Sequence, residues 1–209
     1  MENPDTPQKI GGFTELLPRN HGKTMLISKF RGRKGKIYDY TVFDYKNGTP
    51  ASIIMPLTPS LEVVALYQFR HAADEWVYEL PGGVPAPGDS PKEVARRELE
   101  EETGYRAQKV IGLCPKPTWF EPANFTVPYW TYAGLNCVKT KEPNPDKHEY
   151  LVVRLIPLGQ WLEMIQNGTV VDSKSIAVTL LSLLRMGGLT KNLPDYLDWM
   201  ERACGPDIT

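Results

Sequence analysis

The stretch GGVPAPGDSPKEVARRELEEETGY, residues 82–105, decides the fold of this chain. Ser90 is a favourable helix N-cap, Pro91 suits the first helical position, and a glutamate three positions after Ser90 completes a capping box. Gly104 supplies a C-terminal stop signal. These signals predict a glycine pair, a short loop and then a helix over residues 91–103.

Carboxylates crowd the second half of this predicted helix. Glu98, Glu101 and Glu102 share one face, because residues three and four apart on a helix are neighbours, whereas Glu100 points elsewhere. Such like-charge pairs destabilise an exposed helix by about 0.2–0.5 kcal/mol each. A solvated acidic face is the alternative for a generic acidic run, but here the glycine pair and the capped helix direct the carboxylates to one point. Since Mg²⁺ prefers oxygen ligands and binds substrate phosphates, the pattern predicts a divalent metal site.

The rest of the chain combines strand patterns with a helical C-terminal part. β-Branched and aromatic runs predict strands within residues 24–69 and at residues 76–80, 109–113, 126–136 and 150–155.

Helical periodicity predicts three further helices, at residues 158–165, 176–184 and 196–202. Asp172 or Ser173 caps the second of them, and Pro194 opens the third. Residues 1–22 lack periodicity and are expected to form a loose arm. The sum predicts an α+β domain, an α/β/α sandwich in which helices flank a mixed β-sheet.

Composition limits the class of protein. The chain has 209 residues, of which 41% are hydrophobic, which suits one compact domain or a core with a small appendage. A net charge of -1 favours neither nucleic acid nor an anionic membrane as a partner. The scattered cysteines Cys114, Cys137 and Cys204 argue against a zinc site or a disulfide framework. No signal peptide or long apolar run is seen, so we expect a soluble, cytoplasmic protein.

A local basic cluster precedes residue 40. It consists of Lys23, Lys29, Arg31, Arg33, Lys34 and Lys36. The glycine-spaced core RGRKGK is typical of a solvated hairpin turn, and we favour this interpretation over a nucleic-acid patch because no recognition-helix pattern accompanies it.

The opening stretch resembles the signature of Nudix hydrolases, which reads Gly, five residues, Glu, seven residues, then Arg-Glu-aliphatic-any-Glu-Glu-any-Gly-aliphatic. In this chain the matching residues are Gly83, Asp89, Arg97, Glu98, Leu99, Glu101, Glu102, Gly104 and Tyr105. Two positions depart from the signature: Asp89 replaces a glutamate, and Tyr105 replaces an aliphatic residue.

The resemblance implies a set of metal ligands. Glu98 and Glu102 are expected to bind Mg²⁺, or Mn²⁺ in its place, together with the backbone carbonyl of Gly82. Glu101 is expected to act as a ligand or as a proton handler. The remaining signature residues are expected to support the loop structurally: Gly83, Asp89, Arg97 and Gly104.

Sequence around the signature resembles the ADP-ribose and nucleotide-sugar pyrophosphatase branch of that family. The segments YQFR, WVYELPGG and NGTVVDSKSIAVTLL carry this likeness, which extends over roughly residues 25–185. It implies Mg²⁺-dependent hydrolysis of the pyrophosphate bond of ADP-ribose or a related nucleoside diphosphate sugar. The segment Glu121-Pro122-Ala123 departs from the branch pattern, which leaves GDP-mannose or UDP-glucose as alternative substrates. A non-catalytic nucleotide-binding module is a further alternative.

Substrate-contacting residues are expected near the signature. Arg70 offers bidentate donors to phosphate oxygens, unless it pairs with Asp74 or Glu75. Glu79 is expected to bond the distal sugar or to buttress the helix. In this branch the general base comes from an acidic loop after the signature, which makes Glu149 the expected base.

Several further residues remain open at this point. Asp146 and Glu142 are the reserve candidates for the base. Trp76, Trp119 and Phe120 would stack a nucleobase if they do not belong to the core.

The branch also suggests a division of the chain. Residues 1–55 would form a β-rich arm that mediates homodimerisation, and residues 56–209 would form the hydrolase domain.

Overall fold

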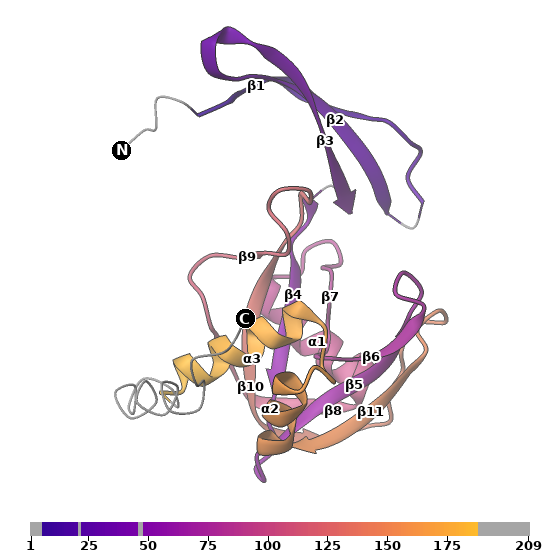
Figure 1. Ribbon diagram of the computed structural model, residues 1–209. Helices are drawn as coiled ribbons and strands as arrows, with labels where there is room; N and C mark the ends of the chain where they lie inside the picture. The colour runs from indigo at the N-terminus through magenta and orange to yellow at the C-terminus, as the bar shows by residue number, and fades with distance from the viewer. Residues whose placement is uncertain (1–5, 21, 46–47, 188–209) are drawn as a thin grey trace.

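A computed structural model gives the structure of the chain and describes residues 6–20, 22–45 and 48–187 (Figure 1). Its N-terminal part is an antiparallel three-stranded sheet with strand order β1-β2-β3. The strands are β1 (Gln8–Glu15), β2 (Lys23–Arg31) and β3 (Ile37–Tyr45). A short 3₁₀ turn, Arg33–Gly35, joins β2 to β3, so the prediction of a hairpin turn at RGRKGK is confirmed.

Strand β1 corrects the expectation of a loose arm over residues 1–22. Every side chain of β1 is exposed, and the pairing with β2 shifts register between Ile10 and Thr14, where the chain passes through Gly11 and Gly12. Backbone hydrogen bonds to β2, rather than burial of a periodic apolar face, therefore define this strand. The sequence carries no periodic signal of that kind.

The central sheet is mixed, as expected. Its strands are β4 (Ala51–Pro56), β7 (Gly82–Gly83), β8 (Tyr105–Gly112), β9 (Thr118–Trp119) and β10 (Pro128–Lys139). They follow the order β7-β4-β10-β8, with β9 paired to β10. Strands β4 and β10 run parallel, whereas β10 pairs with β8 in the antiparallel sense.

A third sheet, antiparallel throughout, lies beside the central one. Its order is β11-β5-β6, formed by β5 (Glu62–Arg70), β6 (Glu75–Glu79) and β11 (Leu151–Pro157). Strand β6 runs into Pro81 and the glycine pair of β7, and the Pro81 carbonyl accepts a hydrogen bond of 3.0 Å from the Ile54 N–H of β4. This bond attaches the end of one sheet to the middle of the other.

Three helices cover the sheets. They are α1 (Pro91–Thr103), α2 (Leu158–Gln166) and α3 (Ser173–Arg185). Helix α1 begins at the predicted capping box of Ser90 and Glu93 and ends at Gly104, whose φ is 76°. Asp172 is the N-cap of α3. The helix predicted at residues 196–202 lies outside the described residues.

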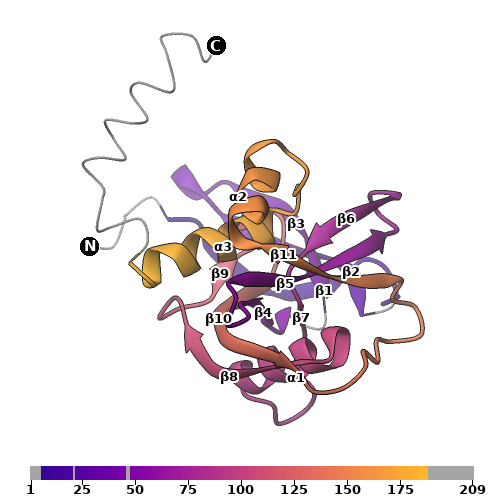
Figure 2. The ribbon, with the colours of Figure 1, turned by 90° about the horizontal axis from the view of Figure 1, so that it is seen from below.

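The layers follow from the alternation of side chains along β4. Ile54 packs with Leu99 of α1 on one face, whereas Ile53 and Met55 pack with Trp161 and other residues of α2 and α3 on the opposite face. Figure 2 shows α1 on one side of the sheets and α2 with α3 on the other, which is the predicted α/β/α arrangement.

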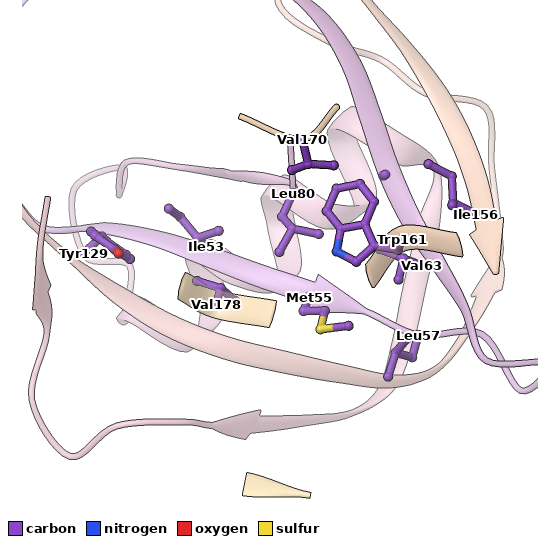
Figure 3. Packing of buried hydrophobic residues seen from close by; sticks show 11 residues of the cluster. Ile53, Met55, Leu57, Val63, Leu80, Tyr129, Ile156, Trp161, Val170 and Val178 are labelled. Atoms are coloured by element: carbon purple, nitrogen blue, oxygen red, sulfur yellow. The ribbon is translucent and has the colours of Figure 1, made fainter. Parts of the chain in front are cut away.

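Trp161 is the largest fully buried side chain and lies at the centre of the α2/α3 core. Leu80, Val63 and Val170 surround its ring in Figure 3. Its Nε1–H donates to Thr179 Oγ1 at 2.9 Å, so the polar atom of the indole is satisfied within the core.

The N-terminal sheet contacts the rest of the molecule through the loop before β10. Phe43 N–H donates to the Asn124 carbonyl at 2.7 Å, and Thr126 N–H donates to the Phe43 carbonyl at 3.0 Å. Tyr40 OH donates to the Ala123 carbonyl at 2.8 Å. The predicted division after residue 55 falls inside β4. The division into arm and hydrolase domain stays a prediction.

Within the described residues, the helices are all too short or too polar to cross a membrane.

Candidate functional site

Two carboxylates of α1 point toward the glycine pair. Glu102 is only 4% exposed, and its Oε2 accepts a hydrogen bond of 3.0 Å from Gly82 N–H. Glu98 lies against Gly83 so closely that a Cβ at that glycine would be 2.3 Å from Glu98 Oε1. A side chain at Gly83 would displace the Glu98 carboxylate, so the glycine keeps that carboxylate in its present place.

Gly82 is equally constrained from the other side. A Cβ at this position would lie 2.5 Å from the carbonyl oxygen of Ser52 in β4. The strand-loop-helix unit thus brings the backbone of β7 between a neighbouring strand and the carboxylates of α1.

Burial makes these two carboxylates hard to ionise. The pKa of Glu102 is raised well above its ordinary value, first by desolvation and then by the negative charge of Glu98. Burial also raises the pKa of Glu98, although the neighbouring Arg97 opposes the shift. Two partly desolvated acids placed side by side are stabilised as carboxylates by a cation between them.

The donor set fits magnesium. In the described part of the chain, no three His, Cys, Asp or Glu side chains stand together as a ready-made metal cage. Mg²⁺ is usually bound by one or two carboxylates and keeps its other positions for water and substrate phosphate. Glu98, Glu102 and the carbonyl of Gly82 supply a partial, all-oxygen set of this kind.

Arg97 ties the signature loop to the helix. Its guanidinium lies 2.8 Å from a Glu101 carboxylate oxygen, 2.9 Å from one of Glu98 and 3.4 Å from one of Asp89. It also donates to the carbonyl of Val84 at 3.0 Å. Glu101 is thereby drawn toward Arg97, with 42% of its side chain exposed. The role of Glu101 as a ligand or proton handler stays a prediction.

Asp89 supports the loop despite being one methylene shorter than the usual glutamate. Its Oδ2 accepts the Ala86 N–H at 3.0 Å, which closes the turn that precedes the helix. The same oxygen faces Arg97, as noted above.

Gly104 allows a second loop to reach the site. A Cβ at this residue would lie 2.2 Å from the Lys141 carbonyl oxygen, and the Thr140 N–H donates to the Gly104 carbonyl at 2.9 Å. Farther on, Asn144 N–H donates to the Glu101 carbonyl at 2.7 Å. The acidic loop after β10 is therefore held against the C-terminal end of α1.

This loop brings Glu149 to the carboxylates. Phe69 N–H donates to the Tyr150 carbonyl at 2.9 Å, so the chain already runs beside β5 at this point. The charge of Glu149 contributes to the raised pKa values of Glu98 and Glu102, so Glu149 is close enough to act on both electrostatically. One of its carboxylate oxygens accepts the Asp146 N–H at 2.9 Å. Asp146 thus orients Glu149.

Glu142, the other reserve candidate, points elsewhere. Its carboxylate is 83% exposed and lies 2.7 Å from Lys139 Nζ.

Arg70 and Glu79, both predicted to contact substrate, contact each other. Arg70 Nε and Nη2 donate to the two oxygens of Glu79 at 2.6 Å each, so neither Asp74 nor Glu75 is the main partner. Hydrogen bonding to Glu79 raises the pKa of Arg70, and the charge of Glu102 adds to the effect. Glu79 is 5% exposed at its side chain, whereas Arg70 is 46% exposed and remains open to a ligand.

The aromatic candidates are not gathered at the carboxylates. Trp76 pairs with Phe69 in the register of β5 and β6, so it lies on the sheet face opposite to Arg70, where it stacks on Tyr67 with ring centroids 5.2 Å apart. Phe120 packs edge-on against Phe125 at 5.2 Å. Trp119 is half exposed in the short strand β9.

A cavity of about 830 Å³ opens between the N-terminal sheet and the turn after β5. Lys23, Phe43, His71 and His148 are among its lining residues, whereas the carboxylates of α1 are not. Its size lies within the range of small-molecule sites, and it borders the acidic loop through His148.

Two residues of the site were not identified from the sequence. Gln68 lies on the same face of β5 as Arg70, is 2% exposed, and its Oε1 has no hydrogen-bond partner in the described structure. Its only sequence signal was its place in YQFR. Ser175 accepts a hydrogen bond from Leu80 N–H at 2.8 Å, a contact that no local pattern reveals because 95 residues separate the two.

Comparisons with known proteins identify the family and relatives of this chain. The model of the NUDIX domain matches residues 46–177. A CMP-5'-(N-acetyl-N-hydroxy-3-aminopropyl)phosphonate hydrolase of Streptomyces rubellomurinus is 31% identical over 140 residues, which is 66% of this chain and 65% of that protein. An ADP-ribose pyrophosphatase of Bacillus subtilis is 27% identical over 161 residues, which is 71% of this chain and 86% of its own.

A solved structure shares the fold. It is described as the crystal structure of an ADP compounds hydrolase and superposes with a TM-score of 0.73 at 16% sequence identity, covering 90% of this chain and 98% of the other.

Proposed function

Because the chain belongs to the NUDIX family, we propose that it hydrolyses the pyrophosphate bond of a nucleoside diphosphate sugar, with ADP-ribose as the first candidate. The products would be a nucleoside monophosphate and a sugar phosphate, here AMP and ribose 5-phosphate. The observation that carries the proposal is the pair of carboxylates, Glu102 against Gly82 and Glu98 against Gly83, with Arg70 and Glu149 close enough to act on Glu102 electrostatically.

Glu98, Glu102 and the carbonyl of Gly82 are the residues that would hold Mg²⁺, or Mn²⁺ in its place. A bound divalent ion supplies charge neutralisation at the phosphoryl oxygens and lowers the pKa of a bound water. The burial of Glu102 and the 14% exposure of the Glu98 side chain favour this role, because charges attract more strongly where water is excluded.

Arg70 is the group that would hold the diphosphate. Glu79 uses both of its oxygens to fix the guanidinium at the end of β5, and the exposed part of Arg70 remains available to an anion. Because Glu79 already orients the Arg70 guanidinium, less side-chain entropy is lost when the substrate binds.

Glu149 is the group that would accept a proton from the attacking water. The water oxygen forms a new bond to one phosphorus atom, the bond from that phosphorus to the bridging oxygen breaks, and the bridging oxygen leaves with the other phosphate. Asp146 N–H orients Glu149 through one carboxylate oxygen, which leaves the other oxygen available for the proton.

The base of the substrate is the open question within this proposal. Of the two relatives described above, one is named for a cytidylyl compound and the other for ADP-ribose. Sugar nucleotides such as GDP-mannose and UDP-glucose are the alternatives.

A panel of nucleotide sugars with Mg²⁺ tests the proposal, with products separated by HPLC. We expect AMP and ribose 5-phosphate from ADP-ribose, and no turnover after chelation. A higher kcat/KM for GDP-mannose or UDP-glucose than for ADP-ribose would assign that sugar nucleotide as the substrate instead. Absence of hydrolysis across the panel would contradict the proposed function.

We further propose that the protein is a cytoplasmic homodimer that associates through residues 1–55. The support is the apolar surface of the N-terminal sheet, where large side chains remain exposed: Phe13, Leu16, Leu17, Ile37, Tyr38, Tyr40 and Phe43. Light scattering during gel filtration should give twice the chain mass. A monomer at micromolar concentration would contradict it.

A further inference from the structure

The segment that carries the site is anchored by a residue far away in the sequence. Leu80 N–H donates to Ser175 Oγ at 2.8 Å, and both residues are buried, with Ser175 0% exposed. A buried backbone N–H needs a partner, and Leu80 finds it in the first turn of α3 rather than in a neighbouring strand.

Asp172 fixes the direction of the Ser175 hydroxyl. Ser175 Oγ donates its single proton to Asp172 Oδ2 at 2.7 Å, and the same oxygen accepts the Ser175 N–H at 2.9 Å. Because a hydroxyl has one proton, this donation leaves its lone pairs to accept Leu80 N–H. The charged acceptor strengthens the arrangement, and 10% exposure of the Asp172 side chain shields it from water.

Leu80 lies between the two halves of the proposed site. Glu79, which holds Arg70, precedes it, and Gly82, whose N–H contacts Glu102, follows two residues later. Fixing the backbone at Leu80 therefore constrains the phosphate-binding arginine and the metal-binding loop together.

We propose that Ser175 is a positioning residue: through Leu80 it sets the place of Gly82 relative to Glu102 and of Glu79 relative to Arg70. This inference rests on the proposed function, because it assigns the metal and phosphate groups to those residues. Asp172 acts as the second member of the same hydrogen-bonded chain. Neither residue contacts the substrate in this account.

Ser182 provides a matched control on the same helix. It is also 0% exposed, but its hydroxyl donates to the Val178 carbonyl one turn earlier at 2.8 Å, so it touches no part of the site segment. Ser175→Ala and Ser182→Ala remove the same atom from the same depth of burial. A purely structural role for Ser175 predicts similar consequences for both.

The experiment compares the wild type, Ser175→Ala and Ser182→Ala as full-length proteins, by Mn²⁺ titration calorimetry and by hydrogen exchange at the Leu80 amide. We expect Ser175→Ala to weaken Mn²⁺ binding by about 10- to 100-fold, the usual range for residues that orient metal ligands. Exchange at Leu80 should accelerate only in this variant. Equal Mn²⁺ affinities in the two variants, or unchanged exchange at Leu80, would overturn the inference.

Three further outcomes remain informative. If Ser175→Ala does not fold, Ser175→Thr, which keeps the hydroxyl, should bind Mn²⁺ within about threefold of the wild type, and a loss of about tenfold or more would count against the inference. A wild type that binds Mn²⁺ but hydrolyses no nucleotide sugar would refute the proposed function alone. A wild type that binds no Mn²⁺ would refute both.

Discussion

Glu100 and Glu102 lie two residues apart on α1, and their pKa values shift in opposite directions. Glu100 lies at the surface with 23% of its side chain exposed, and hydrogen bonding to Arg106 lowers its pKa, with Lys141 also close. Glu102 faces the interior, where burial and the charge of Glu98 raise its pKa. Folding gives Glu100 basic partners at ion-pair distance, whereas in the described structure Glu102 has no ion-pair partner and Arg70 acts on it only at longer range.

This difference indicates which of the crowded glutamates serve function. Isolated buried charges are costly, so a buried acid without a basic partner marks a place where an external cation supplies the missing charge. Arg97 neutralises the flank of the site by binding Glu101, and Arg70 is engaged by Glu79. Within the described part of the chain, Glu102 accepts a hydrogen bond from the backbone N–H of Gly82 and forms no ion pair.

The largest effect should separate these two glutamates. Glu102→Gln should lower kcat by about 10³-fold or more, because loss of several kcal/mol of metal-derived stabilisation corresponds to tenfold per 1.36 kcal/mol. Glu100→Gln, which removes only a surface ion pair, should leave kcat within about twofold. Steady-state assays of both variants on ADP-ribose give the comparison. Equal losses would show that the buried and exposed positions do not differ in function.

The second-largest loss of kcat is expected in the acidic loop, where Glu149 is compared with Glu142. Glu149→Gln should lower kcat by about 10²-fold, within the usual range for a general base, because the amide cannot accept the proton from water. Glu142→Gln is the control, since that carboxylate is 83% exposed and pairs with Lys139. Steady-state assays of both variants on ADP-ribose measure the difference. If Glu142→Gln proves the more damaging change, the base has been misassigned.

A smaller effect is expected from a substitution at Gly83, against which the Glu98 carboxylate lies. Gly83→Ala places a Cβ where the Glu98 carboxylate now lies, and the displaced ligand should reduce kcat by about 10- to 100-fold. Gly112→Ala, where an added Cβ would meet only a Tyr132 ring carbon at 3.9 Å, should retain full activity. Thermal melts accompany the assays. A Gly83→Ala enzyme with wild-type kcat would mean that Glu98 need not occupy its present place.

Local sequence predicted the parts of the molecule that local interactions determine. Helix α1 begins and ends where the capping box and Gly104 place it. Strand β1 was not predicted, because it pairs through its backbone without burying a periodic apolar face. The contact between Arg70 and Glu79 depends on the register of β5 against β6, and the sequence offered Asp74 and Glu75 as equally plausible partners.

Long-range contacts explain the remaining omissions. The bond from Leu80 to Ser175 joins residues that only the packing of α3 beside β4 and β10 brings together. From the local sequence, a serine in the first turn of a helix is expected to take part in the N-terminal cap. Ser175 does so, because its N–H and its hydroxyl both donate to the N-cap residue Asp172. Its second contact, with the segment that carries the site, requires the tertiary structure.

The most direct test is to locate the metal. Crystals soaked in Mn²⁺ with a non-hydrolysable ADP-ribose analogue should show an anomalous peak in contact with Glu98, Glu102 and the Gly82 carbonyl, and with a phosphate oxygen of the analogue. A peak on the solvent side of α1 at Glu100, or none at all in the presence of bound analogue, would contradict the claim that the two buried carboxylates hold the ion.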